Sequence, residues 1–214
     1  MEKDIRIAVI GGTGKSGKYL VKQLLKEGLH LRLLVRNPER LMVSDPLIEV
    51  IIGDVKDYAQ VTNLIRGCQA VISTLGMGVP PDEPTVFSQS TKNIIRAMDE
   101  HWVQRYIVIT GLNVDTPFDN KGPNAKFATE WMYRNYPLST TDKQEEYRLL
   151  RESDINWTLV RLPMIELTER SGNIDVNNED CKGDKISATD LASFLSGQLF
   201  DESYVRMAPF ISNY

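Results

Sequence analysis

The stretch IAVIGGTGKSGKYLVKQLL, residues 7–25, spaces three glycines by three at the point where β-forming residues give way to helical apolar spacing. This pattern predicts a strand, a tight turn and a helix in direct succession. Glycine lets the backbone turn and approach a ligand closely, and a helix N-terminus attracts phosphate. The GxxxxGK[ST] spacing of a P-loop is absent. In this context the turn predicts a dinucleotide pyrophosphate site formed by Gly11, Thr13, Gly14, Lys15, Ser16 and Gly17.

Short apolar runs rich in Val, Ile and Leu alternate with amphipathic stretches along the rest of the chain. Because the runs are continuous, they are typical of strands covered on both faces, and the order predicts a doubly wound parallel α/β sheet, the Rossmann fold. The predicted strands are Ile5–Ile10, Leu31–Val35, Ile48–Ile52, Ala70–Thr74, Tyr106–Ile109 and Trp157–Val160. The predicted helices are Lys15–Glu27, Tyr58–Ile65, Ser88–Asp99, Ala125–Tyr133, Asp142–Glu152 and Asp190–Phe200.

Two segments depart from this rhythm. Gly76–Pro84 is too rich in Gly and Pro for regular structure, and Ile165–Lys185 is polar. No linker separates domains, so we expect one domain over residues 1–214, with 165–185 forming a small C-terminal substrate lobe over the site. The substrate pocket would be drawn from these segments and from Gly111–Asn124.

Composition narrows the classes of function. The chain has 214 residues and a net charge of −4, which gives no support for a nucleic-acid partner. Its start, MEKDIRIAVI, enters a strand at once, and no apolar run is long enough to span a bilayer, so we expect a cytoplasmic protein without membrane contact. Cys68 and Cys181 form no CxxC pair and are predicted to be free thiols. No pattern predicts a metal site.

The end of the second predicted strand indicates which cofactor is bound. An NAD site usually has Asp or Glu there to accept the ribose 2′-hydroxyl, whereas this chain reads LLVRNPER with Arg36 in that place. Arg36 would pair with a 2′-phosphate, and Lys15 or Arg40 would add charge. The alternative is a set of solvated basic residues in a loop. The sequence favours NADP (NADPH) over NAD.

The motifs GGTGKSG, LVRNPERL, IIGDVKD, AVISTLG, RYIVITG, LLRESDINWTLVRLP and KISATDLASFL occur in this order. The chain therefore resembles the atypical short-chain dehydrogenase/reductases, with the closest likeness to the NmrA-like and NAD(P)H-binding, biliverdin/flavin-reductase-like branch. The resemblance covers essentially the whole chain. It implies a Rossmann fold and a nicotinamide cofactor.

The resemblance also implies roles for residues after the later strands. Asp54 and Val55 would lie beside the adenine, with a helix N-cap as the alternative role of Asp54. Thr110 would face the nicotinamide, or simply end a strand. Arg161 would hold the chain near the carboxamide, or else pair with an internal acid. The residues implied along the ribose and nicotinamide are Ser73, Thr74, Leu75 and Gly76.

The chain departs from the family in its catalytic residues. Typical members use Tyr-x-x-x-Lys, but no tyrosine here has a lysine four places later. Lys143 stands where the family often has its lysine, and Ser139 precedes it by four. Lys143 would contact the ribose and, with Thr110, form the catalytic pair, or it is a solvated lysine at a helix N-terminus. The candidates for shaping the substrate pocket are Met77, Phe118, Trp131, Tyr133, Tyr136 and Met164, and the alternative for each is ordinary packing.

These features predict an NADPH-dependent oxidoreductase that transfers hydride to a small planar or carbonyl-bearing acceptor, such as a flavin or quinone. A proton would come from solvent or from another side chain. The alternative is a non-catalytic NADP(H)-sensing regulatory protein of NmrA-like type, which the absence of Tyr-x-x-x-Lys favours. An epimerase with tightly bound cofactor is a third hypothesis. The sequence predicts a monomer or homodimer and does not decide between them.

Overall fold

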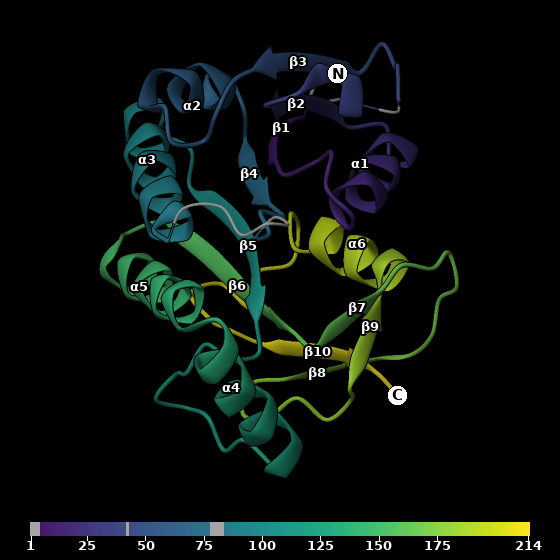
Figure 1. Cartoon of the computed structure of the whole chain (residues 1–214). Coiled ribbons are helices and arrows are strands. Elements are labelled where there is room, and N and C mark those ends of the chain that lie inside the picture. The colour runs from purple at the N-terminus through teal and green to yellow at the C-terminus, as the bar shows by residue number, and fades with distance from the viewer. Residues whose placement is uncertain (1–4, 42, 78–83) are drawn as a thin grey trace.

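The computed structural model describes residues 5–41, 43–77 and 84–214. Over these residues the chain forms an eight-stranded sheet from β1 (Arg6–Ile10), β2 (His30–Val35), β3 (Ile48–Ile52), β4 (Ala70–Ser73), β5 (Arg105–Gly111), β6 (Asn156–Leu162), β8 (Ile174–Asn177) and β10 (Phe210–Asn213). The strand order is β3-β2-β1-β4-β5-β6-β10-β8 (Figure 1). Neighbouring strands are parallel except β10 and β8, which are antiparallel. The predicted doubly wound sheet is therefore confirmed, with one antiparallel strand added at its edge.

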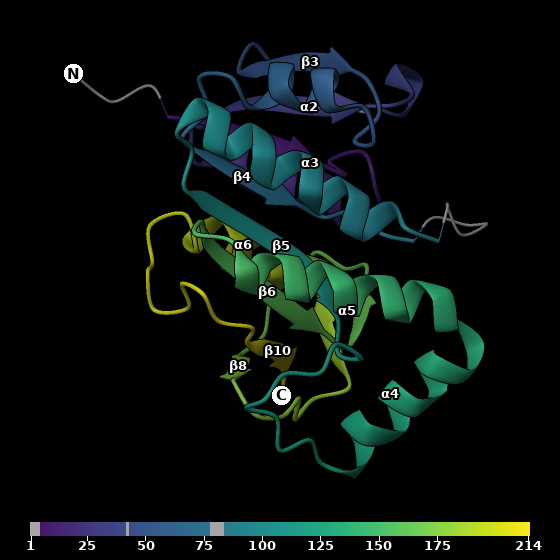
Figure 2. The same ribbon diagram turned by 90° about the vertical axis from the view of Figure 1, so that its left-hand side faces the viewer.

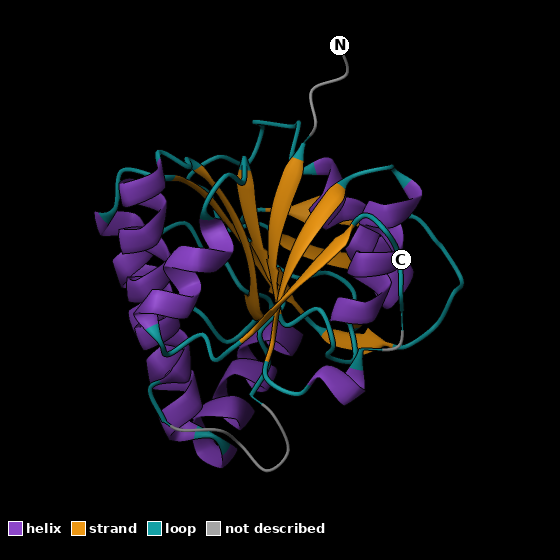
Figure 3. Cartoon of the chain, turned by 90° about the horizontal axis from the view of Figure 1, so that it is seen from above, coloured by secondary structure: helices purple, strands orange, loops and turns teal. Residues whose placement is uncertain are grey.

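Helices cover both faces of this sheet (Figure 3). Their bounds are α1 (Gly17–Lys26), α2 (Tyr58–Ile65), α3 (Val86–His101), α4 (Pro123–Asn135), α5 (Pro137–Glu152) and α6 (Ala188–Gly197). Helices α2, α3 and α5 lie on one face, and α1 and α6 lie on the other (Figure 1). Helix α4 projects beyond the sheet and connects directly to α5 (Figure 2). The described part of the chain has no helix both long and apolar enough to cross a membrane.

The two faces of β1 show why the strands read as continuous apolar runs. Ala8 and Ile10 pack into the cluster beneath α2, α3 and α5, whereas Ile7 and Val9 pack into the cluster beneath α1 and α6. All four side chains are buried. Because both faces are covered, alternation of polar and apolar residues is lost, as parallel sheets require.

Most element boundaries differ from the predicted ones by a few residues. Helix α5 begins at Pro137 rather than Asp142, because proline supplies the first helical residue without losing a hydrogen bond. Helix α1 begins at Gly17 rather than Lys15, because the glycine turn extends two residues further. Helix α6 begins at Ala188 and ends at Gly197, three residues before Phe200, with Ser187 as its N-cap.

Residues 162–213 contain four short strands that the sequence patterns did not indicate. β7 (Met164–Glu166) pairs in parallel with β9 (Lys185–Ser187) in a two-stranded sheet. β8 joins the main sheet only through β10. The segment 165–185 thus supplies strands to both sheets. Of the predicted loop Gly76–Pro84, residues 78–83 lie outside the described part of the chain.

Candidate dinucleotide-binding site

The glycine turn between β1 and α1 brings three parts of the backbone into close contact. Gly11 has a φ of +79°, and a Cβ there would lie 2.8 Å from the carbonyl of Thr74. A Cβ on Gly17 would lie 2.0 Å from the Gly11 oxygen. The amide of Gly14 donates to the Gly11 oxygen at 2.9 Å and closes the turn. Only glycine fits at 11 and 17, so α1 begins directly against the end of β1.

A cleft of about 860 Å³ opens at the carboxyl ends of the parallel strands, within the range of small-molecule sites. It takes in every predicted cofactor residue except Gly17, Ser73 and Arg161. The predicted residues that line it are Gly11, Thr13, Gly14, Lys15, Ser16, Arg36, Arg40, Asp54, Val55, Thr74, Leu75 and Gly76. The strand ends and loops add Ile10, Leu34, Asn37, Gly53, Lys56, Met77, Val86, Ile109 and Ile165.

Basic residues border the cleft after β2. Arg36 follows the last residue of the strand and is exposed. Asn37 accepts a hydrogen bond from the Glu39 amide at 3.0 Å and caps a short 3₁₀ turn, Pro38–Arg40. This cap fixes the direction of the chain, and both Arg36 and Arg40 line the cleft.

Asp54 lines the cleft just after β3. It does not act as the N-cap of α2, which was its alternative role in the sequence analysis. Its carboxylate accepts from the Lys56 amide at 2.9 Å, closing a turn. The cap of α2 is Asp57, which accepts from the amides of Ala59 and Gln60. The N-cap alternative for Asp54 is therefore wrong, because three further residues lie between it and the first helical turn.

Thr110 and Lys143 lie together behind one wall of the cleft. The Lys143 ammonium donates to the Thr110 hydroxyl oxygen at 3.3 Å and lies 4.0 Å above the Phe87 ring. Both residues are buried, so the alternative of a solvated lysine is wrong. The early start of α5 explains this burial, because it places Lys143 in the second turn of the helix, on its inner face. Burial lowers the pKa of Lys143.

Ser73 lies at the end of β4, also behind the wall of the cleft. Its hydroxyl oxygen accepts from the Leu75 amide at 3.4 Å, and Leu75 itself lines the cleft. Thr74, between them, donates from its hydroxyl to the Ile10 oxygen at 3.3 Å. These bonds tie the segment after β4 to the end of β1, so the floor of the cleft is held by both strands.

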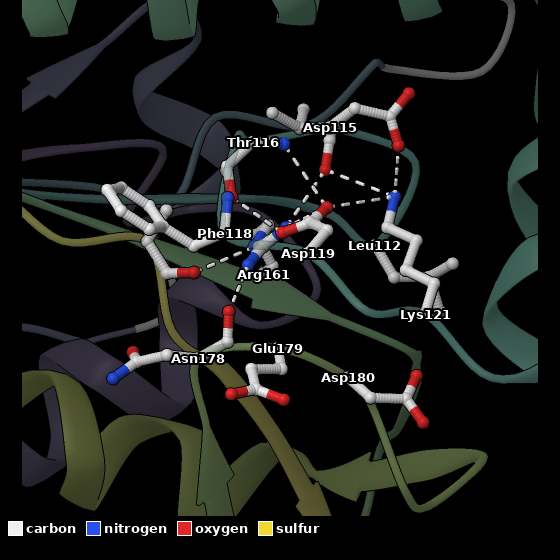
Figure 4. Close-up of polar contacts among 12 residues, drawn as sticks. Leu112, Asp115, Thr116, Phe118, Asp119, Lys121, Arg161, Asn178, Glu179 and Asp180 are labelled. Atoms are coloured by element: carbon white, nitrogen blue, oxygen red, sulfur yellow. Dashed lines mark hydrogen bonds and ion pairs between the residues drawn. The ribbon is translucent and has the colours of Figure 1, made fainter.

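Arg161 lies in the interior and forms the ion pair that the sequence left as an alternative (Figure 4). Its guanidinium is fully buried and contacts both carboxylate oxygens of Asp119, at 2.7 and 2.8 Å. It also donates to backbone oxygens of Ala208, Val114 and Asn178. Arg161 is not among the residues lining the cleft. It instead joins the loop after β5 to the segment after β8.

Lys121 strengthens the same junction. Its ammonium lies 2.6 Å from Asp115 and 3.6 Å from Asp119 (Figure 4). The Asn120 amide donates to the Glu179 oxygen at 2.9 Å. Residues 112–122 are therefore joined to Arg161 by an ion pair and to residue 179 by a backbone hydrogen bond.

Of the side chains considered for the substrate pocket, Met77 lines the cleft. Tyr136 is partly buried against the Trp131 ring, 5.7 Å away between centroids. The others are exposed and do not line the cleft: Phe118, Trp131, Tyr133 and Met164. No group of three or more His, Cys, Asp or Glu side chains within the described ranges could hold a metal ion.

The arrangement fits a dinucleotide. Two glycines are held where a Cβ would collide with backbone, a helix N-terminus faces the cleft, and the cleft crosses the ends of several parallel strands. Fold and cleft together define a Rossmann-type dinucleotide-binding protein. The chain belongs to the NAD(P)H-binding family, whose model matches residues 11–202. The predicted NAD(P)H-binding family is thereby confirmed.

Among curated relatives, an uncharacterized chloroplastic protein of Arabidopsis thaliana is 26% identical, over 83% of this chain and 65% of that protein. The divinyl chlorophyllide a 8-vinyl-reductase of the same plant is 22% identical, over 95% of this chain and 52% of that protein. The chain thus spans between half and two thirds of the length of these relatives.

Two solved structures share the fold over nearly their whole length. An anaerobillin reductase from Escherichia coli O157:H7 superposes with a TM-score of 0.80 and 16% identity, covering 97% of both chains. A short-chain dehydrogenase/reductase from Veillonella parvula, in complex with NADP, gives a TM-score of 0.77 and 16% identity, covering 98% of this chain and 94% of that one. At such identities the likeness shows the fold alone.

Proposed function

We propose that the protein is an NADPH-dependent oxidoreductase that reduces a small planar or carbonyl-bearing acceptor. The observation that carries the proposal is that one cleft joins the glycine turn and the basic residues after β2 to the wall backed by Thr110 and Lys143. Membership of the NAD(P)H-binding family supports the cofactor, and two similar proteins named as reductases support the type of reaction.

The basic wall supports NADPH over NADH. Arg36, Arg40 and Lys15 all line the cleft, whereas the first acid after β2 is Glu39, outside it. A 2′-phosphate would be bound there by charge-assisted hydrogen bonds, which are about twice as strong as neutral ones. The solved relative in complex with NADP agrees with this choice.

Residues at the ends of different strands would bind different parts of the dinucleotide. The glycine turn and α1 would hold the pyrophosphate, Asp54 and Val55 the adenosine, and the segment Thr74–Gly76 the second ribose. A bound nicotinamide supplies the hydride. The Thr110 oxygen accepts from Lys143, and this buried pair would act on the bound nicotinamide through space rather than by direct contact.

Arg36→Asp tests the cofactor assignment. We expect NADPH affinity to fall by on the order of 2 kcal/mol or more, since an attractive contact becomes a like-charge contact. NADPH fluorescence measures the dissociation constant. Arg134→Asp, which makes the same change of charge in the last turn of α4, should leave the affinity unchanged. Equal affinities for the two variants would refute the role of Arg36.

Turnover is tested by loss of nicotinamide absorbance with flavin, quinone and carbonyl acceptors. We expect oxidation of NADPH with at least one class, and a large loss of rate in Lys143→Met. Binding of NADPH without oxidation by any acceptor would contradict the reductase. Failure to bind either dinucleotide at micromolar concentration would contradict every function based on this cleft.

A second candidate is a non-catalytic NADP(H)-sensing protein. The burial of Thr110 and Lys143 behind the wall, together with the absence of Tyr-x-x-x-Lys, favours it. It requires different affinities for NADP⁺ and NADPH and a partner protein captured with only one of them. Equal affinities for the two nucleotides would eliminate this candidate.

A further inference from the structure

A second buried ionisable side chain lies one helical turn beyond Lys143. Glu146 is buried between α5 and α3, where its Oε1 atom accepts from the Thr91 hydroxyl at 2.9 Å. Its Oε2 atom is also buried and has no hydrogen-bond partner among the described residues. The carboxyl and the Lys143 ammonium share the inner face of α5 without coming within 4.0 Å, so they influence each other through space rather than as a contact pair.

The groups around Glu146 leave its charge state finely balanced. Desolvation raises the pKa of Glu146 to about 7, against the attraction of Lys143 and the Thr91 hydrogen bond. Asp142 also faces this region, but its carboxylate is held by the Phe87 and Ser88 amides at the start of α3. From β5, Tyr106 stays protonated because burial raises its pKa well above the usual range.

Lys143 connects this cluster to the wall of the cleft, because it contacts Thr110 and Phe87. Thr110 follows Ile109, and Phe87 follows Val86; Ile109 and Val86 both line the cleft. The basic residues and Asp54 line the part of the cleft at the ends of β2 and β3, so the Glu146 cluster backs the nicotinamide half in the binding mode proposed above. Glu146, Lys143 and Thr110 are all buried, and a charge in such surroundings acts at low effective dielectric.

We propose that Glu146 determines the specificity of the cleft for the redox state of the nicotinamide ring, favouring NADP⁺ when ionised and NADPH when protonated. The proposal rests on the proposed function. The oxidised ring carries a positive charge that the reduced ring lacks. An ionised Glu146 attracts that charge and compensates Lys143, whereas a protonated Glu146 leaves the ammonium to repel it. By linkage, binding of NADP⁺ releases a proton from Glu146 and binding of NADPH retains it.

The test is a titration of both nucleotides with the whole chain from about pH 6 to about pH 8. In the wild type, the ratio of the NADPH to the NADP⁺ dissociation constant should rise with pH, by on the order of fivefold. In Glu146→Gln the ratio should stay constant. Calorimetry in buffers of different ionisation enthalpy should show proton release with NADP⁺ that the variant lacks. None of these readouts depends on turnover.

Two further variants complete the test. Glu145→Gln changes a half-exposed neighbour that pairs with Arg148, and it should keep the wild-type pH dependence. Thr91→Val removes a hydrogen bond that lowers the pKa of Glu146, so the midpoint should move to higher pH. A constant ratio in the wild type, or an unmoved midpoint in Thr91→Val, would overturn the proposal even if Glu146→Gln failed to fold. Absence of all nucleotide binding would instead reject the proposed function.

Discussion

Replacing Asp119 is the strongest test of which contacts stabilise the region beside the cleft. Asp119→Ala removes the carboxylate from Arg161, whose side chain is fully buried. The guanidinium would keep only neutral backbone acceptors, and breaking a buried pair by removing one partner costs about 3–5 kcal/mol. For a chain of this length, each kcal/mol shifts Tm by about 2–4 °C, so we expect a fall of about 6–20 °C.

Urea unfolding followed by circular dichroism measures the loss directly. Glu49→Ala is the matched control, because it removes the carboxylate from Arg32 at a half-exposed position. Arg32 keeps the backbone oxygens of Asn63, Leu64 and Arg66, so this loss should stay below about 1 kcal/mol. Equal losses for the two variants would refute the view that burial of Arg161 gives the Asp119 pair its importance.

Gly17→Ala should lower stability by about 1–3 kcal/mol and weaken NADPH binding, since the new Cβ would lie 2.0 Å from the Gly11 oxygen. Fluorescence titration checks the binding, and Gly197→Ala, with open space around it at the end of α6, should weaken neither property. Glu146 has an ordinary pKa of 4.5 that burial raises to about 7, so wild-type stability should fall as pH rises through that interval, by on the order of 3 kcal/mol. The urea midpoint should therefore fall more between about pH 5 and about pH 8 in the wild type than in Glu146→Gln; a wild-type loss no larger than the variant's would contradict the burial argument. Trp102 ends α3 with a φ of +57° and is 88% exposed, so Trp102→Gly should raise stability by up to about 1 kcal/mol, and a lower Tm would show that the indole contributes packing.

The order of elements and most of the cleft were predictable because they depend on local patterns. Continuous apolar runs indicate covered parallel strands, and the glycine spacing indicates the turn. Once these are known, the carboxyl ends of the strands meet at one edge, which places Arg36, Asp54 and Thr74 in one cleft. The same logic extends to the strand-terminal residues Ile10 and Ile109, which the sequence analysis named as strand ends but not as site residues.

Burial of charge was not predictable from the same patterns. The helix DKQEEYRLLRE reads as a solvated surface, and on one side it is, since Arg148 pairs with Glu145 and Glu152 in the open. On the other side, Lys143 and Glu146 point inward, and their three-residue spacing is the signal that could have suggested a shared face. The short strands β8 and β10 have only four residues each, too few for a periodic pattern.

The position of β10 affects the order in which the strands can pair during synthesis. It lies between β6 and β8, yet it is synthesised after both. The strands from β1 to β5 can pair among themselves as they leave the ribosome, whereas β8 has no neighbour in the main sheet until β10 arrives. Until then β6 presents an open edge, and Arg161 lacks the Phe210 ring that packs 3.5 Å from its guanidinium. Until β10 is synthesised and pairs with β6, that open edge is exposed to incorrect strand pairing.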